Sequence, residues 1–211
     1  CAQLQADLIE YLFRTKGYDK IITSYAPSNE PLGVGISYED WSTMIKKLYT
    51  ELEKRGLPTN FLSGADSWSD WIWKPAQYNA DQLSAYDFHN YLNDTPDDTY
   101  NQLYNRTIET TFANYLANVY KYDNFNKPVH VSEMAPIGVP FIDWPVADAP
   151  AHCRIDTYEY ALGFWDYGIQ LARSGMASGL AWAIDGLEQN KNAGMWNNAG
   201  TYGGMTLRPW Y

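Results

Sequence analysis

Five short apolar segments, separated by stretches with helical periodicity, set the strongest limit on the fold of this chain. The apolar segments cover residues 21–25, 60–64, 85–89, 129–132 and 179–184. The helical stretches cover residues 2–15, 37–56, 68–83, 100–122 and 152–173. Strands that alternate with helices of this length predict βαβ units in a parallel α/β sheet. No change of composition divides the sequence, so residues 1–211 are expected to form one layered unit.

Two of these helices have a predicted buried face. The first helix, residues 2–15, places four apolar side chains on one side: Leu4, Leu8, Ile9 and Leu12. The second helix has Ser37 and Asp40 at capping-box spacing, with aspartate in place of the usual glutamate, and Gly56 ends it. Its apolar stripe consists of Trp41, Ile45, Leu48 and Leu52. The stretch 68–83 is expected to be an irregular helix, because Pro75 interrupts it.

Polar residues follow each of the five predicted strands. The strand ends read S-N-E-P at 28–31, G-A-D-S at 64–67, H-N-Y at 89–91, S-E-M at 132–134 and D-G at 185–186. Parallel α/β folds build their active sites at the carboxyl ends of the strands. A doubly wound sheet and a (β/α)8 barrel both fit this order, although neither G-x-G-x-x-G nor G-x-x-x-x-G-K-[ST] is present to favour a nucleotide site.

Two of the strand ends carry a glutamate, Glu30 and Glu133. An N-E-P sequence can be a simple turn, since asparagine and proline are common turn residues. Cleavage of a glycosidic bond, however, requires a pair of carboxyl groups, one to protonate the leaving oxygen and one to attack or to activate water. The two glutamates follow strands that are three apart in order, which places them almost opposite each other across the mouth of an eight-stranded barrel. The pair therefore favours a glycosidase site.

The composition favours a neutral, sugar-like ligand. The formal charge of -10 and the lack of a basic run disfavour nucleic acid and anionic lipid as partners. Nine tryptophans and eighteen tyrosines supply rings that suit the C–H faces of sugars. Two cysteines and three histidines without ligand spacing make a disulfide framework, a protein-built metal site or a cofactor unexpected. No apolar run approaches the roughly 18 residues of a membrane span.

Four motifs in order resemble those of clan A glycoside hydrolases, most closely family five. They are N-E-P, H-N-Y, V-H-V-S-E and A-W-A-I-D, and the resemblance covers residues 20–211. Enzymes of that family are retaining (β/α)8 TIM barrels with Asn-Glu after the fourth strand, His-x-Tyr at the sixth, a nucleophilic glutamate at the seventh and tryptophan at the eighth. The resemblance implies that Glu30 is the general acid/base, that Glu133 is the nucleophile and that Asn29 binds the 2-hydroxyl of the sugar.

Three further residues receive a role from the same resemblance. Tyr91 resembles the hydroxyl that positions the nucleophile, His89 a partner near the acid/base or the sugar, and Trp182 the platform beneath the reacting sugar. Asp66 and Asp185 also stand at strand ends but match no role of the family, so a structural role is favoured for both. Packing is likewise favoured for the cluster Trp68, Trp71 and Trp73.

The resemblance also implies that the barrel is incomplete in this chain. A (β/α)8 barrel needs about 250 residues and eight strands, whereas the sequence shows strands four to eight, from the helix before strand four to the start of helix eight. The first three strands are expected from the rest of a larger protein, which the family resemblance makes secreted, periplasmic or cell-surface. Two alternatives are a noncatalytic carbohydrate-binding barrel fragment and an unrelated α/β enzyme in which N-E-P is only a turn.

Overall fold

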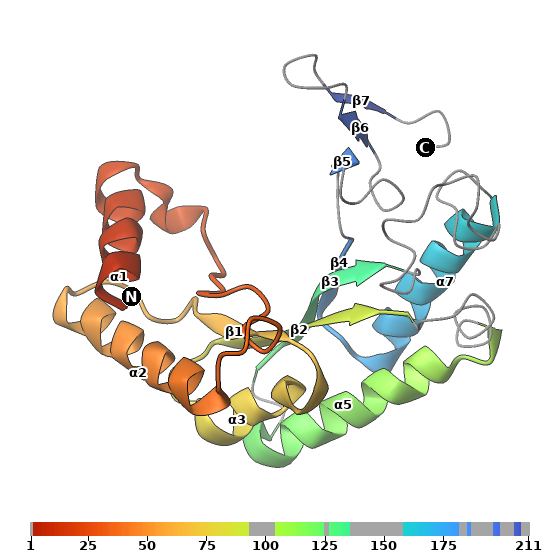
Figure 1. Ribbon diagram of the computed structural model, residues 1–211, viewed down its shortest axis with the longest axis horizontal. Coiled ribbons are helices and arrows are strands. Elements are labelled where there is room, and N and C mark those ends of the chain that lie inside the picture. Colours follow the sequence, from red (N-terminus) through yellow and green to blue (C-terminus); the bar gives the residue numbers. More distant parts are fainter. Residues whose placement is uncertain are drawn as a thin grey trace. The chain divides into compact units, whose positions relative to one another are not determined.

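A computed structural model describes residues 2–92, 104–124, 127–135, 158–181, 185–186, 196–198 and 205–207 (Figure 1). The helices are α1 (Ala2–Glu10), α2 (Tyr38–Lys54), α3 (Lys74–Tyr78), α5 (Thr107–Asp123) and α7 (Tyr158–Ser174), with a π-helical turn η1 (Tyr11–Thr15) and 3-10 turns η2 (Tyr18–Lys20) and η3 (Ser69–Ile72). The strands are β1 (Ser63–Ser67), β2 (Ala85–Tyr91), β3 (Val129–Ala135), β4 (Ser178–Ala181), β5 (Asp185–Gly186), β6 (Trp196–Asn198) and β7 (Met205–Leu207).

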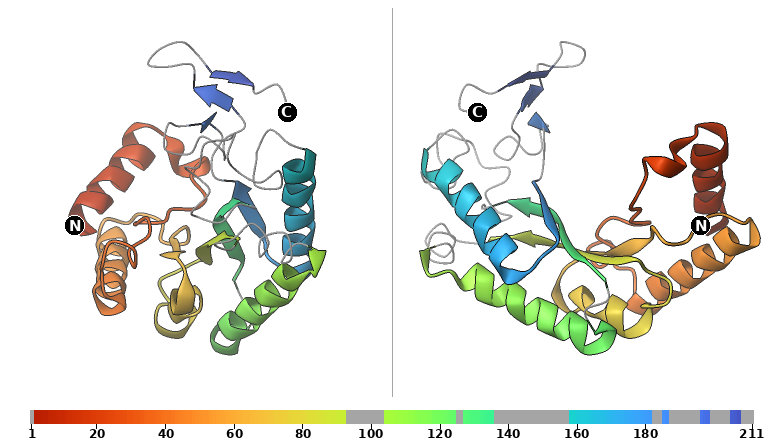
Figure 2. Two further views of the ribbon diagram at one scale, coloured as in Figure 1. Left: turned by 45° about the vertical axis from the view of Figure 1, so that its right-hand side comes forward. Right: turned by 180° about the vertical axis from the view of Figure 1, so that it is seen from behind.

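The first four strands form a parallel sheet in the order β1-β2-β3-β4. Helix α3 lies in the connection from β1 to β2, α5 in that from β2 to β3, and α7 in that from β3 to β4. This confirms the predicted α/β class with a parallel sheet. A second, smaller sheet, which the sequence did not predict, has β6 between a parallel partner, β5, and an antiparallel partner, β7 (Figure 2).

The chain contacts divide into two compact units. The first consists of Cys1–His89 and Tyr115–His130, and the second of Asn90–Asn114 and Val131–Tyr211. Strands β2 and β3 and helix α5 each continue from one unit into the other. Among the described residues, no helix combines the length and the apolar character that a bilayer crossing requires.

Helix α2, in the first unit, forms as predicted. The Ser37 Oγ accepts a hydrogen bond from the backbone N–H of Asp40 at 3.1 Å, which caps the first turn. Gly56 follows the helix with a φ of 62°, a left-handed conformation that glycine adopts readily. The predicted stripe is fully buried: Trp41, Ile45, Leu48 and Leu52.

Helix α1 lies beside α2 and buries a different face from the predicted one. Ala6 and Ile9 are buried, whereas Leu4 and Leu8 are 73% and 47% exposed. The prediction was therefore right for Ile9 and wrong for the two leucines. The physical reason is that positions 4 and 8 and positions 6 and 9 both fit a helical period, and only the contact with α2 selects between them.

The predicted strand at residues 21–25 is reduced to a single parallel bridge between Tyr25 and Leu62. The backbone N–H of Tyr25 donates to the Phe61 carbonyl at 2.8 Å, and its carbonyl accepts from the Ser63 N–H at 3.0 Å. Ile21 is 72% exposed, so the apolar run is only partly buried. The strand prediction was wrong here, because an apolar run alone does not supply a hydrogen-bonding neighbour along its whole length.

Strands β1, β2 and β3 end further toward the carboxyl end than predicted. Strand β1 begins at Ser63, three residues after the predicted start, and β2 and β3 continue to Tyr91 and Ala135. As a result Tyr91 and Glu133, like His89, lie on strands, where the pleat fixes their direction, and not on the loops that follow. Strand β4 occupies the start of the predicted strand at 179–184, whose last three residues lie outside the described ranges.

Aromatic packing accounts for Trp71, which is 3% exposed in η3. Its ring meets Tyr38 edge-on at 5.0 Å between centroids and Trp41 at 6.0 Å. In the second unit, α7 packs on α5 in a similar way, with Tyr167 fully buried and 5.9 Å from Phe112 between ring centroids.

Candidate active site

Glu30 lies in a loop that is stabilised by hydrogen bonds of the Glu30 main chain. Its carbonyl accepts hydrogen bonds from the N–H groups of Gly33 and Val34 at 2.9 and 3.3 Å. Its N–H donates to the carbonyl of Asp66 at 2.9 Å, which ties the loop to the end of β1. The φ of Glu30 is 45°, an uncommon value for a residue with a side chain. Strain of this type persists where the surroundings determine the conformation, and it is concentrated at functional sites.

Two tryptophans support the same loop. The indole N–H of Trp41 donates to the Ser28 Oγ at 3.0 Å, two residues before Glu30. The six-membered ring of Trp68 lies so close to Gly33 that a Cβ at this position would be 2.8 Å from it. A larger residue at position 33 would therefore push the Trp68 ring aside. These contacts fix where the Glu30 carboxylate leaves the loop.

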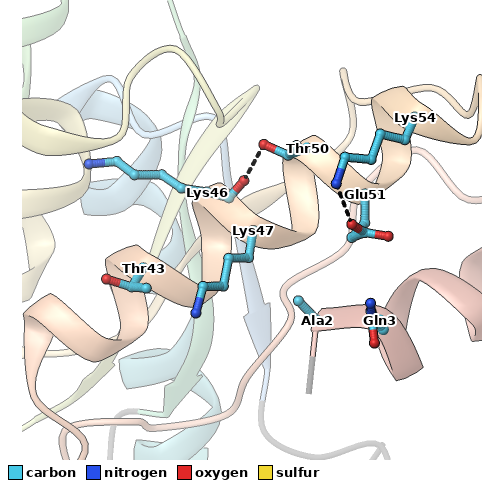
Figure 3. A pocket seen from close by; sticks show the side chains of 8 residues that line it. All are labelled: Ala2, Gln3, Thr43, Lys46, Lys47, Thr50, Glu51 and Lys54. Carbon is cyan, nitrogen blue, oxygen red and sulfur yellow. Dashed lines mark hydrogen bonds and ion pairs between the residues drawn. The ribbon is translucent and has the colours of Figure 1, made fainter.

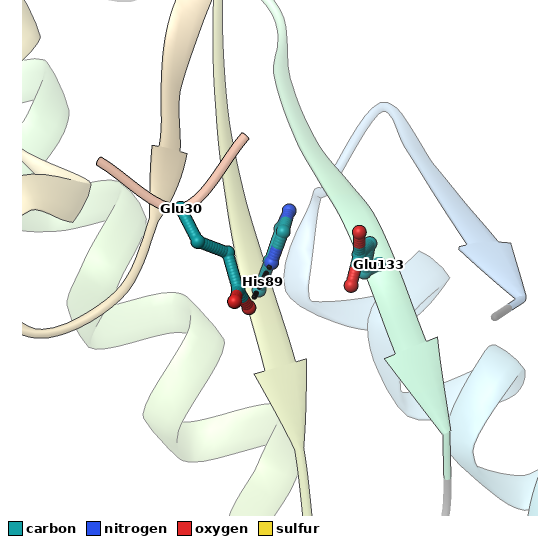
Figure 4. A group of neighbouring side chains, drawn as sticks. All are labelled: Glu30, His89 and Glu133. Carbon is teal, nitrogen blue, oxygen red and sulfur yellow. Dashed lines mark hydrogen bonds and ion pairs between the residues drawn. The ribbon is translucent and has the colours of Figure 1, made fainter. Parts of the chain in front are cut away.

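His89 joins the Glu30 carboxylate to the end of β1. Its side chain is only 2% exposed, and its Nδ1 lies 2.8 Å from the Oε1 of Glu30, as the dashed line in Figure 4 marks. Its Nε2 lies 2.9 Å from the Oδ1 of Asp66. The Glu30 side chain is 36% exposed, so the carboxylate is anchored on a buried ring and still reaches solvent. This is the arrangement that a group exchanging protons with a bound molecule requires.

The Asp66 side chain points toward His89 because the pairing register of β1 and β2 is interrupted at this residue. Ala65 pairs with Asp87 and Ser67 pairs with Phe88, so Asp66 is an extra residue in its strand, a β-bulge. Its φ of 55° is left-handed. Bulges often redirect a side chain beside an active site, and this bulge turns the Asp66 carboxylate to the ring of His89.

Asp87 lies in the centre of β2 and is 5% exposed. Its Oδ1 accepts a hydrogen bond from the backbone N–H of Asp66 at 2.7 Å. Burial, and next the negative charge of Asp66, raise the pKa of Asp87 to about 7, although the Ser63 hydroxyl and the Asp66 N–H act in the opposite direction. The Asp87 carboxyl therefore titrates near neutral pH.

The second glutamate is held by a tyrosine. The Tyr91 hydroxyl donates to the Oε2 of Glu133, on β3, at 2.7 Å; Figure 4 also draws Glu133. Asn90, the residue before Tyr91, accepts hydrogen bonds from the Tyr167 hydroxyl at its carbonyl (3.0 Å) and at its Oδ1 (2.5 Å). Helix α7 thereby fixes the end of β2 that carries Tyr91.

The six predicted site residues thus have different outcomes. The Glu30 carboxylate lies within hydrogen-bonding distance of the His89 ring, and the Tyr91 hydroxyl donates to the Glu133 carboxylate. Asn29 is exposed beside Glu30. Trp182 lies outside the described residues. Both ring nitrogens of His89 contact carboxyl oxygens, and we assign no metal site to the ring.

Two residues of the cluster were not predicted to have a functional role. Asp66 stood at a strand end but was assigned a structural role, and Asp87 was not considered. A signal was present for Asp87: it is an ionisable residue in the apolar run A-Y-D-F-H, two positions before His89. Residues two apart on a strand share a face, so Asp87 lies on the same face of β2 as the histidine.

A separate groove between α1 and α2 is lined by Ala2, Gln3, Thr43, Lys46, Lys47, Thr50, Glu51 and Lys54 (Figure 3). Lys54 pairs with Glu51 at 2.9 Å, and the Thr50 hydroxyl donates to the Lys46 carbonyl at 2.9 Å. None of these residues belongs to the Glu30 cluster. Exposed lysines of this kind are ordinary for the outer face of a helix, so the groove is not assigned a function.

Comparisons with known proteins show which solved structures share this fold. No family model and no curated protein matches the chain. Among the solved structures that match it, three have a TM-score of 0.58 each: a GH39 β-xylosidase and a monomeric β-xylosidase from Caulobacter crescentus, and the GH39 enzyme from Xanthomonas axonopodis pv. citri. The identities are 11%, 12% and 12%, over 92%, 94% and 92% of this chain.

The chain spans about two-fifths of the length of these structures, namely 40%, 43% and 38%. At this level of identity the likeness shows a shared fold: the chain is an α/β protein that corresponds to part of a TIM barrel. The structures belong to clan A, in agreement with the clan of the sequence resemblance, but they do not single out family five.

Proposed function

We propose that the protein is a retaining glycoside hydrolase that cleaves β-linked glycosidic bonds by double displacement, with Glu30 as acid/base and Glu133 as nucleophile. One observation carries the proposal: His89 and Tyr91 lie two residues apart on β2, and each holds one of the two carboxylates. Residues so spaced share a face and start about 7 Å apart along the strand. One strand thus carries the partners of both groups, and in the proposed reaction both carboxylates act on one sugar.

In the first step, the Glu133 carboxylate attacks the anomeric carbon while Glu30 gives its proton to the glycosidic oxygen. The carbon–oxygen bond breaks, the alcohol leaves, and a glycosyl ester forms on Glu133. The Tyr91 hydroxyl orients the attacking carboxylate through its hydrogen bond to Oε2. In the second step, Glu30 takes a proton from water, the water oxygen attacks the anomeric carbon, and Glu133 is released.

Further roles follow from the sequence resemblance. Asn29 binds the 2-hydroxyl of the reacting sugar, Trp182 stacks beneath it, and the first three barrel strands come from the rest of the protein. The substrate is a plant or microbial polysaccharide or oligosaccharide, which makes a secreted, periplasmic or cell-surface location the natural one. Because two of the similar structures are named β-xylosidases, aryl β-xylosides belong in the first substrate panel beside β-glucans, mannans and xylans.

The proposal is tested by the stereochemistry of the product. The protein in its full length is incubated with the best substrate of the panel, and proton NMR records the first anomer before mutarotation. We expect retained configuration, and Glu133→Gln should abolish turnover, whereas Glu53→Gln, at an exposed position of α2, should not change it. An inverted first product would overturn the proposal. Sugar binding without hydrolysis in the wild type would establish the noncatalytic alternative.

A further inference from the structure

A single buried imidazole connects two carboxyl groups in the first unit. The Nδ1 of His89 faces Glu30 at 2.8 Å and its Nε2 faces Asp66 at 2.9 Å. A neutral imidazole carries one N–H donor and one bare acceptor nitrogen. Two lone pairs do not face each other at such distances, so each of the two contacts contains a proton. One of these protons is bonded to the ring, and the other lies between the ring and a carboxyl group.

We propose that Asp66 is a positioning residue that fixes the N–H of His89 at Nε2, so that the proton between Nδ1 and Glu30 remains transferable. This inference rests on the proposed function, since it concerns the proton that Glu30 delivers. With Asp66 accepting from Nε2–H, the proton in the other contact lies either on the Glu30 carboxyl or on Nδ1 of an imidazolium. In both cases the proton lies in the contact between Nδ1 and Glu30, from which it can be transferred.

The opposite tautomer would have a different consequence. A neutral ring with its proton on Nδ1 would donate that proton to an ionised Glu30, and the proton of a neutral imidazole is not released at ordinary pH. Glu30 would then have no proton to give to the leaving oxygen. A carboxylate that orients the far nitrogen of a histidine and selects its tautomer is a recurring device, both in catalytic triads and in metal sites.

The backbone holds Asp66 rigidly in this position. Its carbonyl accepts from the Glu30 N–H at 2.9 Å, and its own N–H donates to the buried Asp87 at 2.7 Å. The bulge between Ala65 and Ser67 turns the carboxylate to the ring. Asp66 is therefore linked to Glu30 twice, through the main chain and through His89.

The protons balance over the proposed reaction. The proton shared by Glu30 and Nδ1 passes to the glycosidic oxygen when the carbon–oxygen bond breaks, and the proton lost by water in the second step returns to the same contact. The Nε2–H stays on the ring and remains hydrogen-bonded to Asp66 throughout. No other donor or acceptor is required.

The closing experiment compares the wild type with Asp66→Asn, whose amide can donate to Nε2 and so favour the wrong tautomer. A ¹⁵N-detected NMR spectrum of the His89 ring reports which nitrogen carries the proton, whether or not the protein hydrolyses sugars. We expect Nε2–H in the wild type from about pH 5 to pH 8, and a shift of the proton to Nδ1 in the variant. A wild-type ring protonated at Nδ1 alone would overturn the inference, even if the variant fails to fold.

Kinetics supply the second readout. General acid catalysis contributes about 10²–10⁴-fold, so kcat/KM of Asp66→Asn should fall at least about tenfold for a substrate whose leaving group needs a proton. The 2,4-dinitrophenyl glycoside needs none and should lose less than about threefold. Asp70→Asn, whose side chain is 46% exposed and paired with Lys74, is the matched control and should behave as wild type. Equal losses on both substrates would contradict the positioning role, whereas absence of wild-type activity would refute the proposed function alone.

Discussion

Raising the pH is expected to destabilise the folded protein through a single buried side chain, Asp87. This carboxyl is 5% exposed in the centre of β2. Burial and the neighbouring Asp66 raise its pKa from 3.8 to about 7 in the folded state. At a pH between these two values the folded protein holds a proton that the unfolded chain has released. Protonation therefore stabilises the fold, and this contribution is lost as the pH rises through about 7.

The size of the effect follows from the two pKa values. Each pH unit between them changes the free energy of unfolding by about 1.4 kcal/mol. Raising the pH from about 5 to about 8 crosses roughly two such units, so Asp87 should remove about 3 kcal/mol of stability. The variant Asp87→Asn keeps the volume of the side chain and an oxygen that can accept from the Asp66 N–H, but it carries no titrating proton.

Urea denaturation of both proteins at several pH values measures the difference. The stability of Asp87→Asn relative to wild type should increase by about 3 kcal/mol between the two ends of the pH range. Asp19→Asn, at an exposed position of η2, is the control and should follow the wild type at every pH. If wild type and Asp87→Asn lose the same stability as the pH rises, Asp87 is not the group that titrates and the reasoning is wrong.

Two further predictions concern the second carboxylate and the core. Tyr91→Phe removes the donor at 2.7 Å from Glu133. Because a hydrogen bond to a charged group is worth about 1.5–3 kcal/mol, kcat should fall about 10–100-fold in steady-state assays, while circular dichroism shows an unchanged fold. An unaltered kcat would exclude the orienting role. Gly64→Ala places a Cβ 2.5 Å from the buried ring of Trp41 and should destabilise the protein by about 1–3 kcal/mol in urea titrations; equal stability would show that the ring can move aside.

Helix α2 shows how much of the fold local sequence could predict. Its cap at Ser37, its stripe beginning at Trp41 and its end at Gly56 all appear as expected, because capping and helical period are local properties. The proximity of His89 to Glu30 could also be expected from the sequence. The resemblance placed His89 near the proposed acid/base or the sugar, and in the structure His89 contacts Glu30 at 2.8 Å.

The proposed role of Asp66 could not be predicted from the sequence, for a physical reason. Strict alternation along β1 would direct Asp66 away from the face that carries Ala65 and Ser67, and only the bulge with its left-handed φ redirects it. A bulge depends on the register with a second strand, which a single sequence does not encode locally. The same dependence on a partner strand reduced residues 21–25 to one bridge at Tyr25.

The most direct test of the central claim is to trap the intermediate. A 2-deoxy-2-fluoro glycoside with a good leaving group, built on the best sugar of the substrate panel, slows the second step so that the glycosyl-enzyme accumulates. Digestion and tandem mass spectrometry then identify the labelled residue. We expect one label per protein on Glu133, and none in Glu133→Gln. A label on a different residue, or steady turnover without a covalent adduct, would contradict the central claim.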